Sequence, residues 1–204
     1  MTSFRPIAAY DSASWMESKN YIFESDRLGF RKWLPSDAEP FASMNADPVV
    51  MEFFPKMLTR EESDAFISRI EASFAEYGYD FWAVEEKARR NFIGFIGFAH
   101  PRFEAPFTPC IEIGWRLAKE FWNKGYATEG ARACLEYGFN ELGFTEVLSF
   151  TAVTNIRSER VMQKIGMEKI GEFDHPNVDP TSSLYRHVLY RSTKETTSES
   201  LPTY

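Results

Sequence analysis

Three segments of the chain decide its fold: IEIGWRL at residues 111–117, WNKGYATEG at residues 122–130 and NIRSERVMQKIGM at residues 155–167. The first segment predicts a β-strand, the second a glycine-containing turn that opens an amphipathic helix, and the third a shorter helix that ends at Gly166. This order of strand, turn and helix indicates a protein that holds the pyrophosphate of a long cofactor at a helix N-terminus.

The composition indicates a single folded domain. The chain has 204 residues, of which 44% are hydrophobic and 16% aromatic, which is enough for one substantial core. We expect an N-terminal extension at residues 1–19, one domain at residues 20–191, and a disordered Ser- and Thr-rich tail at residues 192–204. No run of about eighteen apolar residues is present, so we expect a cytoplasmic protein without a membrane partner.

The charge and the cysteine content argue against several classes of function. The net charge is −7 without a block of like charges, which opposes binding to nucleic acid and is compatible with a cationic partner such as an amine. Neither Cys110 nor Cys134 has the spacing of a metal ligand or a CxxC motif, so we expect two buried free thiols, no disulfide and no metal site.

Apolar periodicity predicts a mixed α/β sheet of about seven strands with four helices. We expect strands at residues 28–33, 81–85, 92–98, 110–117, 147–151, 167–173 and 184–190. We expect helices at residues 36–44, 59–77, 126–142 and 155–165. Two capping boxes, Ser36 with Glu39 and Thr59 with Glu62, are predicted to start the first two helices.

The turn before the third helix predicts an anion site. Six residues would present successive backbone N–H groups at the helix N-terminus: Asn123, Lys124, Gly125, Tyr126, Ala127 and Thr128. Gly125 would let the chain approach a phosphate because it lacks a Cβ atom, and Asn123 belongs to a residue type that tolerates positive φ. The alternative is a glycine loop that only starts a helix. GxxxxGK[ST] and a strand-linked GxGxxG are both absent, which argues against nucleoside triphosphates and dinucleotides.

Glu112 is the candidate general base. Strand alternation puts Glu112, Gly114 and Arg116 on one face of the predicted strand and apolar residues on the other. A carboxylate on this strand can accept a proton from an amine through water. The structural alternative for Glu112 is a cross-strand ion pair or a solvated edge.

Together these segments resemble the GNAT superfamily of acyl-CoA N-acyltransferases, in its branch of ribosomal-protein alanine N-acetyltransferases (RimJ/RimL-like). The resemblance covers roughly half of the chain. The phosphate-binding pattern of the family is Gln or Arg, two residues, Gly, one residue, then Gly or Ala. Trp122 stands at the first place of this pattern, and Asn123 stands where a Gly is usual. The resemblance implies a GNAT-like fold that binds acetyl-CoA.

The resemblance also implies roles for individual residues. Asn155 would bond the pantetheine arm and Ser158 would protonate the departing sulfur, whereas the structural alternative makes Asn155 the N-cap of its helix. His175 and His187 would line the acceptor pocket, or serve only as structural residues. The cofactor contacts that follow are Trp115, Arg116, Leu117, Trp122, Asn123, Lys124, Gly125, Tyr126, Ala127, Thr128 and Asn155.

The implied activity is an acetyl-CoA-dependent N-acetyltransferase in which a primary amine attacks the thioester directly. The backbone N–H of Leu117 is the candidate donor to the developing oxyanion, and no Cys–His pair supports a covalent intermediate. The acceptor would be a protein N-terminus or a small amine, such as an antibiotic or a polyamine; a homodimer is left open. Two rivals are a non-catalytic acyl-CoA sensor, which would need Gly125 and Asn155 but not Glu112 and Ser158, and an interaction module that binds no ligand.

Overall fold

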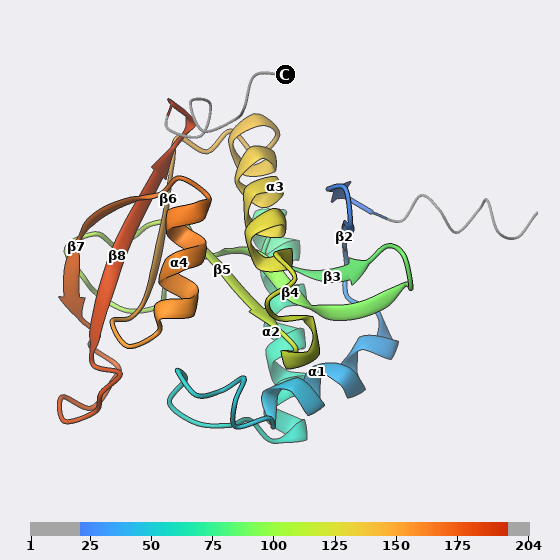
Figure 1. The fold of residues 1–204 in the computed structure, drawn as a ribbon, viewed down its shortest axis with the longest axis horizontal. Helices are drawn as coiled ribbons and strands as arrows, with labels where there is room; N and C mark the ends of the chain where they lie inside the picture. The colour runs from blue at the N-terminus through green and yellow to red at the C-terminus, as the bar shows by residue number, and fades with distance from the viewer. Residues whose placement is uncertain (1–20, 196–204) are drawn as a thin grey trace, which may run out of the picture.

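The structure is a computed structural model that describes residues 21–195 (Figure 1). One sheet of eight strands has the order β1-β2-β3-β4-β5-β6-β8-β7. The strands are β1 (Phe23–Glu24), β2 (Leu28–Arg31), β3 (Phe81–Glu86), β4 (Asn91–Ala99), β5 (Glu112–Leu117), β6 (Glu146–Ala152), β7 (Glu168–Asp174) and β8 (Arg186–Thr193). The helices are η2 (Pro35–Asp37), α1 (Ala38–Asn45), α2 (Arg60–Tyr77), η3 (Lys119–Phe121), α3 (Tyr126–Asn140) and α4 (Ile156–Lys164).

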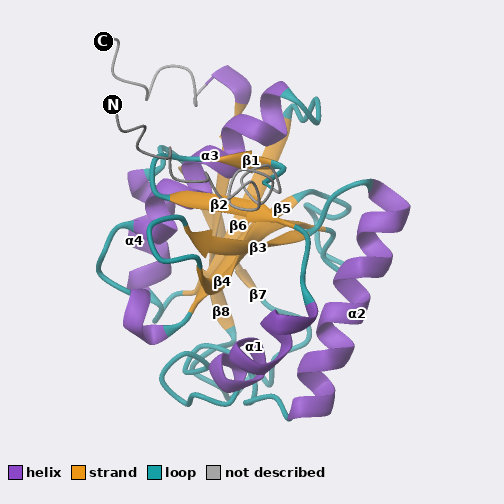
Figure 2. Cartoon of the chain, turned by 90° about the vertical axis from the view of Figure 1, so that its right-hand side faces the viewer, coloured by secondary structure: helices purple, strands orange, loops and turns teal. Residues whose placement is uncertain are grey.

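The sheet separates two layers of helices. Figure 2 shows α3 and α4 on one side of the strands and α2 on the other. The apolar stripe of α3, which includes Ala131, Cys134 and Leu135, packs into the larger core cluster against β4 and β5. A second cluster beneath α1 and α2 contains Phe41 and Ile70. Each face of the sheet therefore has its own core, and side chains that alternate along β5 enter different layers.

The strands β5 and β6 separate soon after they meet. They form a parallel pair whose register includes one pair of Cα partners, Glu112 and Leu148 (Figure 1). All the other pairs in the described sheet are antiparallel. The C-terminal half of β5 thus pairs with β4 on one edge and leaves its other edge open.

Most of the predicted elements are confirmed, and the sheet gains one short strand, β1. The capping box at the start of α2 is confirmed, because Thr59 Oγ1 accepts from the N–H of Glu62 and the Glu62 carboxylate accepts from the N–H of Thr59. The capping box predicted at Ser36 is wrong: Asp37 occupies the N-cap of α1. The Asp37 carboxylate forms a buried pair with Arg31 and accepts from a backbone N–H, which explains why this carboxylate orders the turn.

The last strand continues past residue 191. Ser192 is buried at 1% exposure within β8, which ends at Thr193. The predicted extension at residues 1–19 and residues 196–204 of the predicted tail lie outside the described residues. Within residues 21–195, no helix is both long enough and apolar enough to cross a membrane.

Candidate active site

A cavity of about 760 Å³ lies beside the open edge of β5. Its size is within the range of small-molecule sites. Its walls come from β5, the N-terminus of α3, α4, β6, the residues around β7 and β8, and the loop between α1 and α2. Of the predicted site residues, it brings together Glu112, Trp115, Arg116, Leu117, Trp122, Asn123, Gly125, Tyr126, Ala127, Thr128, Asn155, Ser158, His175 and His187. Lys124 is the exception, and its Nζ atom lies 5.1 Å from the ring centroid of Phe121.

The N-terminus of α3 offers free backbone donors to this cavity. The first helical hydrogen bond runs from the N–H of Glu129 to the carbonyl of Gly125 at 2.9 Å. The N–H groups of residues 126–128 therefore have no acceptor within the helix, and they stand at the positive end of the helix dipole. Because these residues line the cavity, their free N–H groups can donate to an anion there.

The backbone of this turn depends on two residues with positive φ. Gly125 has φ of +80° and Asn123 has φ of +59°, which agrees with the expectation for Asn123. A Cβ atom on Gly125 would meet only Arg27 Nη2 at 3.4 Å. The left-handed conformation at this position therefore favours glycine. A Cβ atom there would point toward Arg27.

Side chains from the turn between β1 and β2 and from the end of β3 hold the turn before α3 in place. Arg27 pairs with Glu129 at 2.6 Å, donates to the carbonyl of Lys124 at 2.9 Å and lies 4.5 Å from the ring centroid of Tyr126. The Tyr126 hydroxyl donates to Glu86. Its side chain thus points into the protein, so Tyr126 contributes to the anion site through its backbone.

Three cations of α4 line the same cavity and were not predicted from the sequence: Arg157, Arg160 and Lys164. Their spacing of three and four residues places them on one face of a helix, which is the signal that could have identified them. Arg157 also pairs with Glu52 at 2.6 Å and lies 4.6 Å from the ring centroid of Trp122. These side chains add positive charge to the wall of the cavity that α4 forms.

The open edge of β5 presents backbone groups to the cavity. Ala118 donates to Ile93 O at 2.9 Å, and hydrogen bonding in an antiparallel ladder alternates, so the N–H and C=O of Leu117 point away from β4. Trp122 Nε1 donates to Leu117 O at 2.7 Å. The Leu117 N–H therefore faces the gap between β5 and β6, where it can donate to a bound carbonyl oxygen.

Asn155 and Ser158 meet at the start of α4. Asn155 is the N-cap, since its Oδ1 atom accepts from the N–H of Ser158 at 3.3 Å, and its Nδ2 atom donates to Thr151 Oγ1 at 2.9 Å. The structural role of Asn155 is thus confirmed, while its second Nδ2 hydrogen has no partner within residues 21–195. The Ser158 side chain lines the cavity.

Glu112 projects into the cavity from the start of β5. Removal from bulk water raises the pKa of its carboxyl from 4.5 to about 8, because burial disfavours the charged form. In the part of the chain that the structure describes, it forms no ion pair, so the cross-strand alternative is not observed. A carboxyl with a pKa near the working pH is suited to exchange protons with a bound amine.

His175 and His187 form part of an aromatic wall. Their rings lie 4.9 Å apart and pack against Phe150 and Phe173. Burial lowers the pKa of His187 to about 4, with a further contribution from His175, whose own pKa burial also lowers. Both imidazoles are neutral at pH 7 and present an uncharged surface to the cavity.

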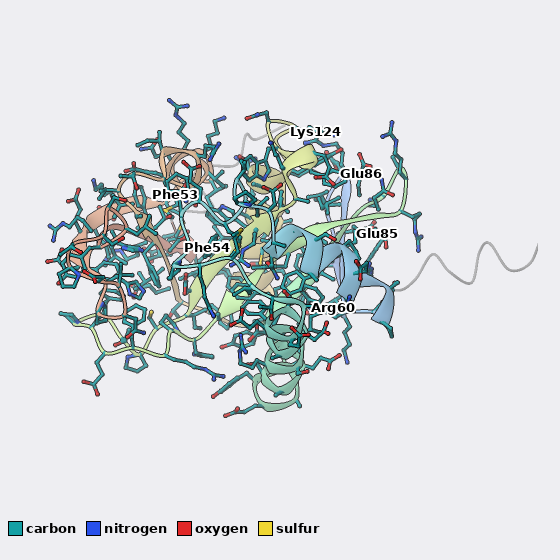
Figure 3. The ribbon with its side chains drawn as sticks, turned by 90° about the horizontal axis from the view of Figure 1, so that it is seen from below. Phe53, Phe54, Arg60, Glu85, Glu86 and Lys124 are labelled. Atoms are coloured by element: carbon teal, nitrogen blue, oxygen red, sulfur yellow. The ribbon has the colours of Figure 1, made fainter. Side chains whose placement is uncertain are left out.

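Arg116 lies on the other face of β5 from Trp115 and Leu117. Its side chain enters the layer beneath α1 and α2, where Nη1 donates to Asn45 Oδ1 at 2.6 Å. The ring of Phe54, on the loop between α1 and α2, lies 3.9 Å from the guanidinium carbon (Figure 3). The Arg116 side chain thus lines the cavity on the side opposite to α3, and the cofactor contact predicted for this residue stays a prediction.

The sequence matches the acetyltransferase (GNAT) domain family over residues 27–168. The N-acetyltransferase YnaD of Bacillus subtilis, itself uncharacterized, is 34% identical over 148 residues, which cover 72% of this chain and 82% of that protein. A GNAT-family acetyltransferase from Bacillus anthracis superposes with a TM-score of 0.70 at 28% identity, covering 84% of this chain and 98% of that one.

A ribosomal-protein-S5-alanine acetyltransferase from Vibrio fischeri is similar in fold. It superposes with a TM-score of 0.68 at 17% identity, covering 85% of this chain and 96% of that structure. At this identity the likeness concerns the fold alone.

Proposed function

Because the chain belongs to the GNAT family of N-acetyltransferases, we propose that it transfers the acetyl group of acetyl-CoA directly to a primary amine in the cavity beside β5. The observation that carries this proposal is the shared position of three groups along one cavity: the amides of residues 126–128, the outward N–H of Leu117 and the carboxyl of Glu112. They are suited in turn to a pyrophosphate, a thioester carbonyl and an amine.

The residues on the α3 side fit the donor. The free amides at the start of α3 and the cations Arg160 and Lys164 would hold the pyrophosphate, and the open edge of β5 would bond the pantetheine arm as an added strand does. Asn155 would add its remaining Nδ2 hydrogen to that arm. Bound acetyl-CoA supplies an activated acetyl carbonyl and a thiolate leaving group.

The chain's own residues then handle charge and protons. Leu117 donates its N–H to the carbonyl oxygen on which negative charge develops. Glu112 accepts the proton of the amine through a chain of water molecules, and its raised pKa keeps it effective near pH 8, where α-amines also lose their proton. Ser158 donates to the departing sulfur. Neither cysteine takes part, because Cys134 is fully buried and burial raises the pKa of Cys110 to about 11.

The acceptor class separates this proposal from its alternatives. A protein N-terminus, as the ribosomal branch would use, and a small amine both fit an open cavity. A non-catalytic acyl-CoA sensor would share the α3 site but gain nothing from Glu112 and Ser158, and both of these side chains face the same cavity as that site. We therefore favour catalysis.

Calorimetry with acetyl-CoA, followed by a thiol-release assay over a panel of amines, tests the proposal. We expect acetyl-CoA to bind and CoA to be released with at least one amine. Binding without thiol release from any amine would favour the sensor. The absence of binding would refute both functions and leave the interaction module.

A further inference from the structure

Arg116 is a buried cation without a counter-ion. The residue is 8% exposed, and its one hydrogen bond within residues 21–195 is the contact of Nη1 with Asn45 Oδ1. Its Nε atom is buried without a partner. A guanidinium has five N–H groups, so four of them lack an acceptor among the described residues. Burying an uncompensated charge is unfavourable for folding, so stability does not explain this arrangement.

The side chains around Arg116 fix its position without neutralising it. Asn45, which is completely buried, donates from Nδ2 to Ser63 Oγ at 3.1 Å, and Ser63 donates to Thr59 O at 2.9 Å at the start of α2. The ring of Phe54 stacks on the guanidinium. Every one of these hydrogen-bond and ring partners is uncharged, so the positive charge of Arg116 stays available to the cavity.

Arg116 and Glu112 lie on one floor of the cavity. Both residues belong to the same face of β5, and four residues of strand separate their Cα atoms by about 13 Å. The ring of Phe81 covers Gly114 between them, since a Cβ atom on Gly114 would lie 3.1 Å from that ring. Glu112 and Arg116 both line the cavity, so a small molecule above the Phe81 ring can contact a carboxyl at one end and a guanidinium at the other.

This floor lies on the acceptor side of the cavity. The phosphate site is at the start of α3, on the opposite face of the sheet from α2 (Figure 2). Arg116 instead contacts Asn45 of α1 and lies 5.9 Å from the ring centroid of Phe66 in α2. Its charge thus lies on the side of the cavity away from the start of α3.

We propose that the acceptor is an amine that also carries a carboxylate, and that Arg116 binds this carboxylate. The inference rests on the acetyl transfer proposed above. A guanidinium with several free N–H groups matches a carboxylate in geometry and charge. A neutral amine would leave Arg116 desolvated and unpaired, and a polyamine would be repelled by it.

Matched substrates test this inference. Wild-type protein is assayed for thiol release with α-, β- and γ-amino acids, each paired with its own carboxamide at equal concentrations of unprotonated amine. We expect kcat/KM to favour the acid of the best pair by about ten- to a hundredfold. In Arg116→Gln we expect this ratio to fall to about one, with partial recovery in Arg116→Lys. Equal rates for the acid and the carboxamide, or an unchanged ratio in Arg116→Gln, would overturn it.

A second variant keeps the test valid if Arg116→Gln does not fold. Asn45→Asp places a carboxylate against Nη1 with almost the same shape, so it supplies the missing counter-ion from within the chain. We expect the KM for the acid acceptor to rise at least about tenfold while the KM for acetyl-CoA stays within about twofold. An unchanged KM for the acid would refute the role of Arg116. If no amine releases CoA, the proposed acetyl transfer fails as well, whereas acetylation without an acid preference refutes this inference alone.

Discussion

Replacing Glu112 with glutamine should change how the stability of the protein depends on pH. Burial raises the pKa of this carboxyl from 4.5 to about 8 in the folded chain. The folded protein therefore holds the proton more tightly than the unfolded chain does. The resulting contribution to stability is complete below pH 4.5, declines as the pH rises and is lost above pH 8. A glutamine side chain has no such titrating proton, so the variant lacks this decline.

The size of the effect follows from the pKa values. One pKa unit corresponds to about 1.36 kcal/mol, so a pKa near 8 in place of 4.5 amounts to roughly 5 kcal/mol between the two ends of the window. The side chain retains some contact with cavity water, which makes this figure an upper bound. Even half of it would be a large fraction of the stability of a domain.

Urea unfolding of the wild type and Glu112→Gln at about pH 5, 7 and 9 measures the difference in unfolding free energy. Other titrating groups are common to both proteins and cancel. We expect the unfolding free energy of the variant to rise relative to that of the wild type by up to about 1.4 kcal/mol per pH unit between pH 4.5 and 8. Above pH 8 the difference should level off. The matched control is Glu120→Gln, which removes an exposed carboxylate from η3, the short helix after β5. A Glu112 difference that stays constant between about pH 5 and 9 would refute the burial argument.

Three further outcomes are expected. Gly125→Ala should weaken acetyl-CoA binding, measured by calorimetry, and destabilise the fold by about 1–2 kcal/mol, because φ of +80° disfavours a Cβ atom; unaltered affinity would remove the turn from the site. Ser158→Ala should lower kcat by about tenfold or more with little change in the dissociation constant for CoA, and an unchanged kcat would leave Ser158 a structural role. His187 should titrate near pH 4 by NMR and stay neutral at pH 7, whereas titration near 6.5 would show that it is exposed to water.

The conformation of the turn before α3 was predictable because its determinants are local. The positive φ of Gly125 and Asn123 and the free amides of α3 depend on a few consecutive residues. The cations of α4 obey an equally local rule, the spacing of one helix face, and could have been found in the same way. A rule based on one motif fails where a neighbouring side chain has a stronger partner: Ser36 does not cap α1, because Asp37, held by Arg31, orders that turn.

The environment of Arg116 was not predictable, although its face of the strand was. Alternation along β5 separates Arg116 from Trp115 and Leu117, as the sequence indicates. Its partner Asn45 lies 71 residues away, and Asn45 is itself fixed by Ser63. No pattern in the sequence indicates that these three side chains meet, or that no carboxylate joins them.

The two sides of the cavity therefore present different kinds of groups, main-chain groups on one side and side chains on the other. The crossover through α3 makes β5 and β6 parallel, and their separation leaves backbone groups of β5 unpaired; Ser149 Oγ, for example, donates to Ile113 O in place of a ladder N–H. In the arrangement that we propose, the donor side thus consists mainly of main-chain groups, which depend little on the identity of the side chains. The proposed acceptor side consists of side chains such as Glu112 and Arg116, which the backbone of the fold does not dictate. A family can for this reason keep one acyl donor while its members choose different amines, and the identity of the acceptor has to be argued from the side chains of this chain.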